Sequence, residues 1–191
     1  MTTVPDAVRI RSATSDDAAA LAAALLRNRA YMRPWEPHRS EAYYTPEGQA
    51  ARLGDGARRW FAVVEGPEGP EGSEESEGPG SEVIVGAATL SGIALGPFRS
   101  GSLGYWVDGD HAGRGLATAL VEEVCRAARE ELGLHRIEAG TLLHNHASQR
   151  VLAKCGFERI GTAPRYLHID GDWRDHHLFQ RILHDDPPPA L

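Results

Sequence analysis

A predicted strand, a glycine-rich turn, a long amphipathic helix and a second strand follow one another between residues 103 and 142. Residues 103–107 and 134–142 have the apolar and β-branched or aromatic content of strands, and Gly133 ends the helix between them. One stripe of that helix, residues 115–132, is apolar: Leu116, Leu120, Val124, Ala128 and Leu132. Two strands of one sheet that are joined by a helix run parallel, through a right-handed crossover. A parallel strand pair is therefore the first constraint on the fold.

Further elements surround this unit. The patterns predict strands at residues 8–13, 60–64, 83–90, 157–161 and 176–183, and helices at residues 14–26, 45–53 and 146–154. Pro34 and Pro37 interrupt helical structure, so residues 31–37 are expected to form an aromatic loop. The order of the elements indicates an α+β fold around a mixed sheet, layered as α/β/α.

The 191 residues, 41% of them hydrophobic, suit one globular domain, which we expect to span residues 1–184 before a flexible tail at 185–191. Residues 66–81 contain no large apolar side chain and are expected to form a disordered acidic insertion. Seven glutamates between residues 65 and 82 account for the whole formal net charge of −7. The rest of the chain is therefore close to neutral.

A near-neutral body argues against a nucleic-acid partner, and the absence of a polybasic cluster argues against an anionic membrane surface. No apolar run approaches the length of a membrane span, and residues 1–11 do not resemble a secretory signal. Cys125 and Cys155 fall in apolar helical patterns, which indicates buried, reduced thiols. A cytoplasmic protein, either a monomer or a homodimer, is expected.

The turn between residues 108 and 118 leads from a strand into the long helix and contains Gly113 and Gly115. Glycines let backbone N–H groups converge, and the helix N-terminus adds unpaired donors and partial positive charge. Such a turn binds phosphate. No Gly-Lys-Ser/Thr sequence follows, and a dinucleotide fingerprint would need a third glycine where Ala117 or Thr118 stands. A purely structural turn stays an alternative.

Asn145 and Ser148 begin the helix that follows the second strand, and Gly156 ends it. Both this pair and the phosphate turn lie at the carboxyl edge of the parallel strands, where ligands bind in open sheets. A simple helix cap would also explain Asn145.

With these residues the chain resembles the GNAT acyl-CoA-dependent N-acetyltransferases, and within them the Rim-type ribosomal-protein alanine acetyltransferases. The resemblance covers about residues 8–183. Its strongest motifs are residues 104–107, 113–118, 134–139, 155–157 and the Asn145/Ser148 pair, with weaker agreement at 33–35, 45–47 and 171–176.

The resemblance implies a mostly antiparallel GNAT sheet whose central parallel strands splay apart and admit acetyl-CoA. It assigns the cofactor to Trp106, Val107, Ala112, Gly113, Arg114, Gly115, Leu116, Ala117, Thr118, Asn145 and Ser148. Ala112 departs from the family pattern, which has Gln or Arg at this position. The backbone of the turn must therefore hold the pyrophosphate without that side chain.

The implied reaction is direct attack of a neutral amine on the thioester, with an acid for the thiolate and a base for the amine. Ser148 is our candidate for the acid and Glu138, acting through a water, for the base. A carboxylate that is satisfied within its strand is an equal interpretation of Glu138, and His135, Tyr166 and His168 also stay open as the base.

The acceptor is expected to be a protein or peptide N-terminus. An α-amine is roughly 14% neutral at pH 7 and a lysine only about 0.04%, so an α-amine needs less help from a base. Four aromatic residues would line the acceptor side: Tyr31, Trp35, Tyr166 and Trp173.

Three alternatives stay open. A small-molecule amine, such as an antibiotic, a polyamine or an amino acid, would use the same fold and cofactor. The absence of a carboxylate near Leu167 and the presence of Ala112 would suit an inactive CoA-binding sensor. A metal site is the third alternative, suggested by His144 with His146 or His176 with His177. No carboxylate or cysteine at a supporting spacing accompanies these histidines, so a bound metal is not expected.

Overall fold

The structure, a computed structural model, describes residues 8–66 and 82–188. The acidic insertion expected at 66–81 lies outside the described residues except for Gly66, as does the end of the predicted tail. Nothing in the described part contradicts a single domain.

Within these residues the sheet consists of β1 (Val8–Ser12), β2 (Arg58–Glu65), β3 (Glu82–Ala94), β4 (Ser100–Val107), β5 (Arg136–Leu142), β6 (Glu158–Ile169) and β7 (Asp172–Ile182). The α-helices are α1 (Ala18–Met32), α2 (Pro46–Leu53), α3 (Leu116–Glu130) and α4 (His146–Lys154). Short 3-10 helices occur at η1 (Ser15–Asp17), η2 (Glu41–Tyr44) and η3 (Gly109–His111).

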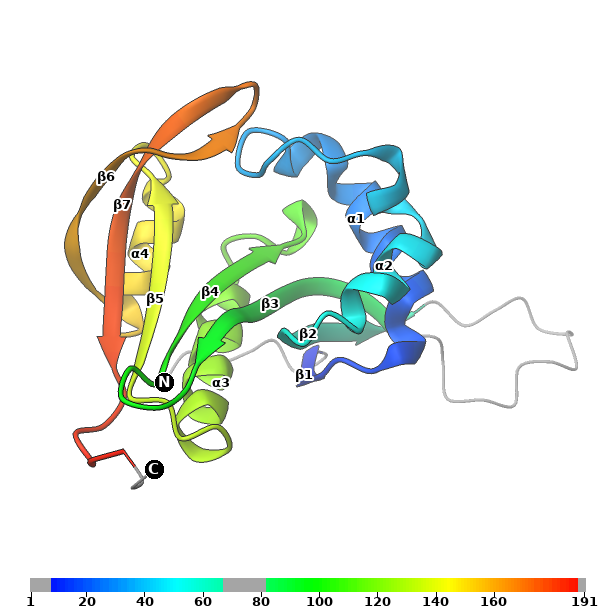
Figure 1. The fold of residues 1–191 in the computed structure, drawn as a ribbon. Helices are drawn as coiled ribbons and strands as arrows, with labels where there is room; N and C mark the ends of the chain where they lie inside the picture. The colour runs from blue at the N-terminus through cyan, green and yellow to red at the C-terminus, as the bar shows by residue number, and fades with distance from the viewer. Residues whose placement is uncertain (1–7, 67–81, 189–191) are drawn as a thin grey trace, which may run out of the picture.

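The strands form one mixed sheet in the order β1-β2-β3-β4-β5-β7-β6. Its neighbouring strands are antiparallel except for β4 and β5, which are parallel as the crossover predicts. This pair is bonded only where residues 100–103 face residues 136–139. Beyond that point β4 stays with β3 and β5 stays with β7, so the sheet divides into two arms (Figure 1). The splayed, mostly antiparallel sheet is thus confirmed.

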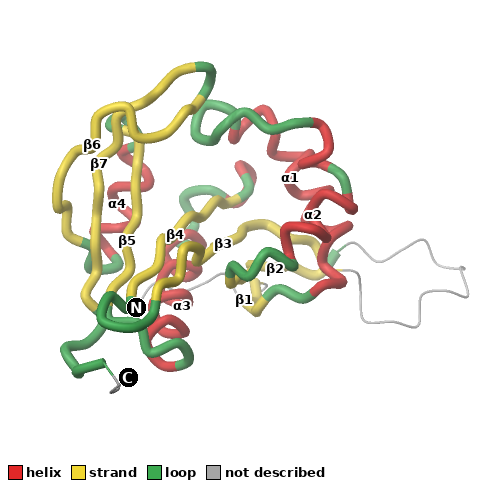
Figure 2. The backbone as a smooth tube through the Cα atoms, in the orientation of Figure 1, coloured by secondary structure: helices red, strands yellow, loops and turns green. Residues whose placement is uncertain are grey.

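Helices cover both faces of the sheet, as the expected α/β/α layering requires. Side chains along a strand alternate between faces. In β2, Phe61 and Val63 pack with Leu21 and Leu25 of α1, whereas the other face of the strand packs under α3. Figure 2 shows α1 and α2 on one side of the strands and α3 on the other. The two apolar layers hold the sheet between them.

Helix α1 is longer than the sequence predicts. The expectation of a loop beginning at Tyr31 was wrong, because α1 continues to Met32 and its cap Arg33 donates its N–H to the carbonyl oxygen of Arg29. Pro34 has no N–H to continue the helical hydrogen bonds, but Arg33 before it keeps a helical conformation, so the preceding turn stays helical. Tyr31 therefore projects from a helix end.

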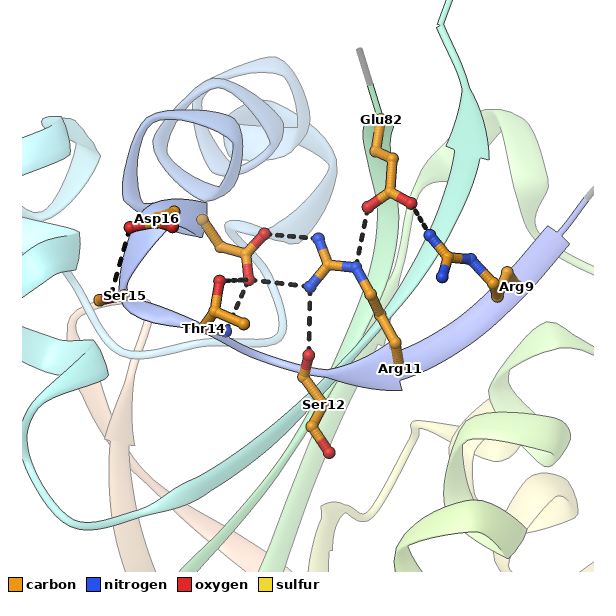
Figure 3. Close-up of polar contacts among 8 residues, drawn as sticks. Arg9, Arg11, Ser12, Thr14, Ser15, Asp16 and Glu82 are labelled. Carbon is orange, nitrogen blue, oxygen red and sulfur yellow. Dashed lines mark hydrogen bonds and ion pairs between the residues drawn. The ribbon is translucent and has the colours of Figure 1, made fainter. Parts of the chain in front are cut away.

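An ion-pair network joins β1 to β3 and to the short helix η1. Arg11 of β1 donates from Nε to Glu82 of β3 at 2.8 Å and from Nη2 to Asp17 at 2.5 Å (Figure 3). Asp17 also accepts from Thr14, and these bonds lower the pKa of its carboxyl despite burial. The network holds η1, and with it the beginning of α1, against the edge of the sheet.

Cys125 and Cys155 are free and buried, as predicted, and burial raises the pKa of their thiols to about 11 and about 12. None of the helices in residues 8–66 and 82–188 is long and apolar enough to cross a membrane.

Candidate active site

A cleft of about 480 Å³ opens where β4 and β5 diverge. Its walls come from the ends of β4 and α1, the turn before α3, the first turn of α3 and one face of α4. The lining residues are Tyr31, Met32, Trp35, Tyr105, Trp106, Val107, His111, Ala112, Gly113, Gly115, Leu116, Ala117, Thr118, Asn145, Ala147, Ser148, Arg150, Val151 and Lys154. The splay therefore brings two distant motifs of the sequence into one site.

The glycine-rich turn has the backbone that an anion site needs. Gly113 and Gly115 have φ angles of 77° and 82°, a left-handed conformation that side chains disfavour. Gly115 caps α3, and no side chain accepts a hydrogen bond from the first turn of this helix. The N–H groups of residues 116–118 thus have no intrahelical acceptor and face the cleft with the helix dipole behind them. Of the predicted turn residues, Arg114 does not line the cleft.

Asn145 and Ser148 lie on the opposite wall, at the start of α4. The side-chain oxygen of Asn145 accepts a hydrogen bond from the N–H of Ser148 at 3.1 Å, so Asn145 is a helix cap, as one interpretation of the sequence held. Ser148 Oγ lies 2.7 Å from the hydroxyl of Tyr105 on β4. This contact spans the splay and fixes the serine hydroxyl.

Tyr105 is a site residue that the sequence analysis did not select, although it lies in the quoted motif 104–107. Burial raises the pKa of its phenol to about 12, and the hydrogen bond between the phenol and Ser148 only partly opposes this. The phenol is therefore neutral near pH 7 and has a proton to donate.

Helix α4 contributes more to the cleft than its first turn. Ala147, Arg150, Val151 and Lys154 recur at spacings of three and four residues, so one helical face lines the cleft. In the described part of the chain, neither Arg150 nor Lys154 forms an ion pair. The spacing was visible in the sequence, and it places two free cations beside the phosphate turn.

The aromatic residues expected on the acceptor side divide into two groups. Tyr31 and Trp35 line the cleft, and the Trp35 ring lies 5.5 Å from the ring of His144, across the splay. Tyr166 and Trp173 lie outside the cleft, in the β6–β7 hairpin, where they pack against His176 and His168 at ring distances of 5.3 and 5.6 Å.

The segment after α1 contacts the β6–β7 hairpin above the cleft. Arg33, just after α1, lies 3.5 Å from the carboxylate of Asp170 at the hairpin tip. His38 approaches the same carboxylate at 3.9 Å. Together with the Trp35–His144 contact, these pairs form a roof, visible at the top of Figure 1 where the hairpin approaches the end of α1.

The candidate bases Glu138 and His135 lie outside the cleft, whereas Ser148, the candidate acid, lines it. Glu138 lies in the bonded part of β5, opposite Ser102, and its carboxylate is 2.7 Å from Arg136. It does not line the cleft. His135 lies at the start of β5, the end remote from the splay, and its Nδ1 is 2.6 Å from the carbonyl oxygen of His184.

The histidine pairs do not assemble into a metal centre in residues 8–66 and 82–188, where no group of three or more metal-binding side chains occurs. His111 does line the cleft, and its buried Nδ1 has no hydrogen-bond partner among the residues that the structure describes. The site thus combines unpaired backbone donors, cations and a hydroxyl pair, a set that suits a phosphorylated ligand with a reactive group near Ser148.

Known proteins resemble this chain in both sequence and fold. Residues 7–158 match the family profile described as "Acetyltransferase (GNAT) domain". The [ribosomal protein uS5]-alanine N-acetyltransferase of Escherichia coli K12 is 33% identical over 180 residues, which cover 91% of this chain and 86% of that protein.

Solved structures of acetyltransferases have a fold similar to that of this chain. The ribosomal-protein-S5-alanine acetyltransferase from Vibrio fischeri is 32% identical and superimposes with a TM-score of 0.83 over 98% of this chain and 100% of the other. Mycobacterium smegmatis RimJ, solved in complex with a CoA disulfide, is 29% identical, with a TM-score of 0.74 over 92% of this chain and 81% of the other.

Proposed function

The chain belongs to the GNAT acetyltransferase family, and from this premise we propose that it transfers an acetyl group from acetyl-CoA to the α-amine of a protein or peptide N-terminus. Acetyl-CoA is the co-substrate of this family, and the enzyme is accordingly an acetyl-CoA-dependent N-acetyltransferase. We further propose that it works in the cytoplasm, as a monomer or a homodimer.

The cleft fits the cofactor. An activated thioester carried on a pantetheine arm, with a pyrophosphate at the far end, is what acetyl-CoA supplies. The N–H groups that follow Gly113 and Gly115 can hold the pyrophosphate, and Arg150 and Lys154 can add charge. Trp106 and Val107 offer backbone groups to the arm along the edge of β4 that β5 has left. The N–H groups of the turn and the two cations would replace the Gln or Arg side chain that the family pattern has at the position of Ala112.

Ser148 is our proposed acid. During transfer the amine nitrogen bonds to the carbonyl carbon, the carbon–sulfur bond breaks and the sulfur leaves with the electron pair. The hydroxyl of Ser148 gives its proton to that sulfur, and Tyr105, 2.7 Å away, donates a hydrogen bond that stabilises the serine oxygen as it becomes negative.

The amine must lose a proton in the same reaction. We propose that Glu138 receives it through a water, since its ion pair with Arg136 and its place outside the cleft rule out direct contact. An α-amine makes little demand on such a base, because roughly 14% of it is neutral at pH 7. This weak base supports an N-terminal acceptor over lysine.

The observation that carries the proposal is the splayed cleft itself, which is lined both by the glycine-rich turn and by the hydroxyl pair of Tyr105 and Ser148. The acceptor class is supported by the ribosomal-protein acetyltransferases, whose similarity spans nearly the whole chain. The roof formed by Arg33, Asp170 and Trp35 suits an extended chain end that enters below it.

The decisive experiment measures thiol release from acetyl-CoA with purified protein. The acceptors are short peptides with free N-termini beginning with Ala or Ser, the same peptides with acetylated N-termini and an internal lysine, and small amines. We expect release with the free N-termini alone. Turnover of small amines would replace the acceptor class, CoA binding without turnover on any acceptor would favour a sensor, and failure to bind CoA would refute the proposal.

A further inference from the structure

A buried asparagine of α1 connects that helix to the phosphate turn. Asn28 is 3% exposed, and its amide nitrogen donates to the Asp108 carboxylate at 2.9 Å and to the carbonyl oxygen of Ala24 at 3.0 Å. Its amide oxygen accepts from the N–H of Gly109 at 3.1 Å. One carboxamide therefore holds both the side chain and the backbone of the segment that follows β4.

Asp108 completes the connection. It is 4% exposed and accepts further hydrogen bonds from Arg27 Nε at 2.9 Å and from the N–H of Asp110 at 3.0 Å. Arg27 also donates to the carbonyl oxygen of Ile84 in β3 at 2.8 Å. Burial alone would raise the pKa of Asp108, but these donors outweigh it and lower the pKa, so the group is a carboxylate.

The turn that follows needs such support. Gly109, Gly113 and Gly115 give residues 109–115 a wide conformational choice, which would cost entropy if phosphate binding had to order them. Gly109 also lies under the Tyr31 ring, so close that an added Cβ would be 3.4 Å from the ring carbons. Helix α1 thus holds the entry to the turn from above, through Asn28 and Tyr31.

We propose that Asn28 and Asp108 are positioning residues that pre-organise the pyrophosphate-binding turn by fixing its first residues to α1. The inference rests on the proposed use of acetyl-CoA at this turn. It predicts that the pair controls the affinity for the nucleotide end of the donor and leaves acetyl transfer itself unchanged, because neither side chain lines the cleft beside Ser148.

The test compares two donors, acetyl-CoA and S-acetylpantetheine, which carries the same thioester but no pyrophosphate. Asn28→Ala and Asp108→Asn are each expected to raise the KM for acetyl-CoA by about tenfold, with kcat within about twofold of wild type. The kcat/KM for S-acetylpantetheine should stay within about twofold. Asp108→Asn preserves the shape of the side chain, which protects the test if Asn28→Ala folds poorly.

Arg29→Ala is the matched control, since it removes the Arg29–Glu41 ion pair from the same helix without touching the turn. Arg29→Ala should leave the KM for acetyl-CoA and the kcat/KM for S-acetylpantetheine unchanged. Comparing two donors within one variant cancels any loss of folded protein. An equal loss with both donors would mean a general structural role and overturn the proposal, as would an unchanged KM for acetyl-CoA. Wild-type protein that failed to use acetyl-CoA would instead refute the proposed function on which this one rests.

Discussion

The hydroxyl of Tyr105 lies 2.7 Å from Ser148 Oγ, so the C-terminal end of β4 and the first turn of α4 are joined by a hydrogen bond across the splayed strands. The same phenol lies 3.2 Å from the carbonyl oxygen of Ser148. A serine hydroxyl held in this way points to a fixed place in the cleft, where the sulfur of the donor would lie.

Replacing Ser148 with alanine should lower kcat by about a hundredfold, because a general acid contributes a factor of that order. The dissociation constant of CoA, measured by calorimetry, should change by less than about threefold. Ser102→Ala, an exposed serine of β4, is the control. Unchanged turnover in Ser148→Ala would show that the thiolate is protonated by another group or by solvent.

Tyr105→Phe should lower kcat by about threefold to tenfold, the effect of one lost hydrogen bond. In a Ser148→Ala background the same change should have no further effect, because the two groups act as one unit. Additive losses in this double-mutant cycle would separate their roles.

The raised pKa of Tyr105 also predicts a pH dependence of stability. The unfolded phenol ionises near pH 10, whereas the folded one resists ionisation until about pH 12. The stability that this neutral phenol contributes is therefore complete below pH 10 and is lost as the pH rises from 10 to about 12. Denaturant unfolding of wild type and Tyr105→Phe between about pH 9 and 11 should show the steeper decline in the wild type.

Gly115→Ala should raise the dissociation constant of CoA by about tenfold or more, since a Cβ at φ 82° strains the turn that presents its N–H groups. Gly56→Ala provides a matched control: its φ is 84°, nothing lies near its missing Cβ, and it is outside the cleft. Both variants should lose about 1 kcal/mol of stability, but only the first should lose affinity. Equal affinity in both would remove the turn from the binding site.

Arg150→Gln and Lys154→Gln should each weaken CoA binding by about threefold to tenfold and reduce its dependence on salt concentration. Calorimetry at two ionic strengths measures both effects. Arg126→Gln, on the exposed face of α3 among three glutamates, should leave CoA binding unaltered. A salt dependence equal to that of the wild type would mean that the α4 cations do not meet the phosphates.

Glu138→Gln should lower kcat by about tenfold if its carboxylate receives the amine proton through a water, and the loss should be greatest at low pH, where less amine is neutral. Arg136→Gln, which removes its ion-pair partner, is the companion variant. A pH profile of Glu138→Gln that superimposes on the wild type would make Glu138 a strand residue satisfied by Arg136.

The local elements could be predicted because each has a local cause. The periodic apolar stripe of α3, the Thr45 cap with Pro46 at the start of α2, and the glycines of the turn all act within a few residues. The length of α1 was underestimated, because Pro34 removes one N–H donor and leaves the hydrogen bonds of the preceding turn intact.

The glycine-rich turn could be found in the sequence for a similar reason. Gly113, Gly115 and the first turn of α3 would bind the cofactor through their own backbone, and the structure places these residues along the cleft. Their role in binding stays a prediction. The places of Tyr166 and Trp173 could not be found in this way, because they depend on how the long β6–β7 hairpin bends away from the cleft, which no local pattern encodes.

The sequence by itself thus determined the order of the elements, the parallel crossover and the position of the glycine-rich turn, because hydrophobic periodicity and backbone freedom are local properties. Only the tertiary structure decided which side chains meet across the splay: Tyr105 with Ser148, and Asn28 with Asp108 and Gly109. Those partners are 43, 80 and 81 residues apart along the chain, and their contact depends on how two arms of a sheet and a helix pack together.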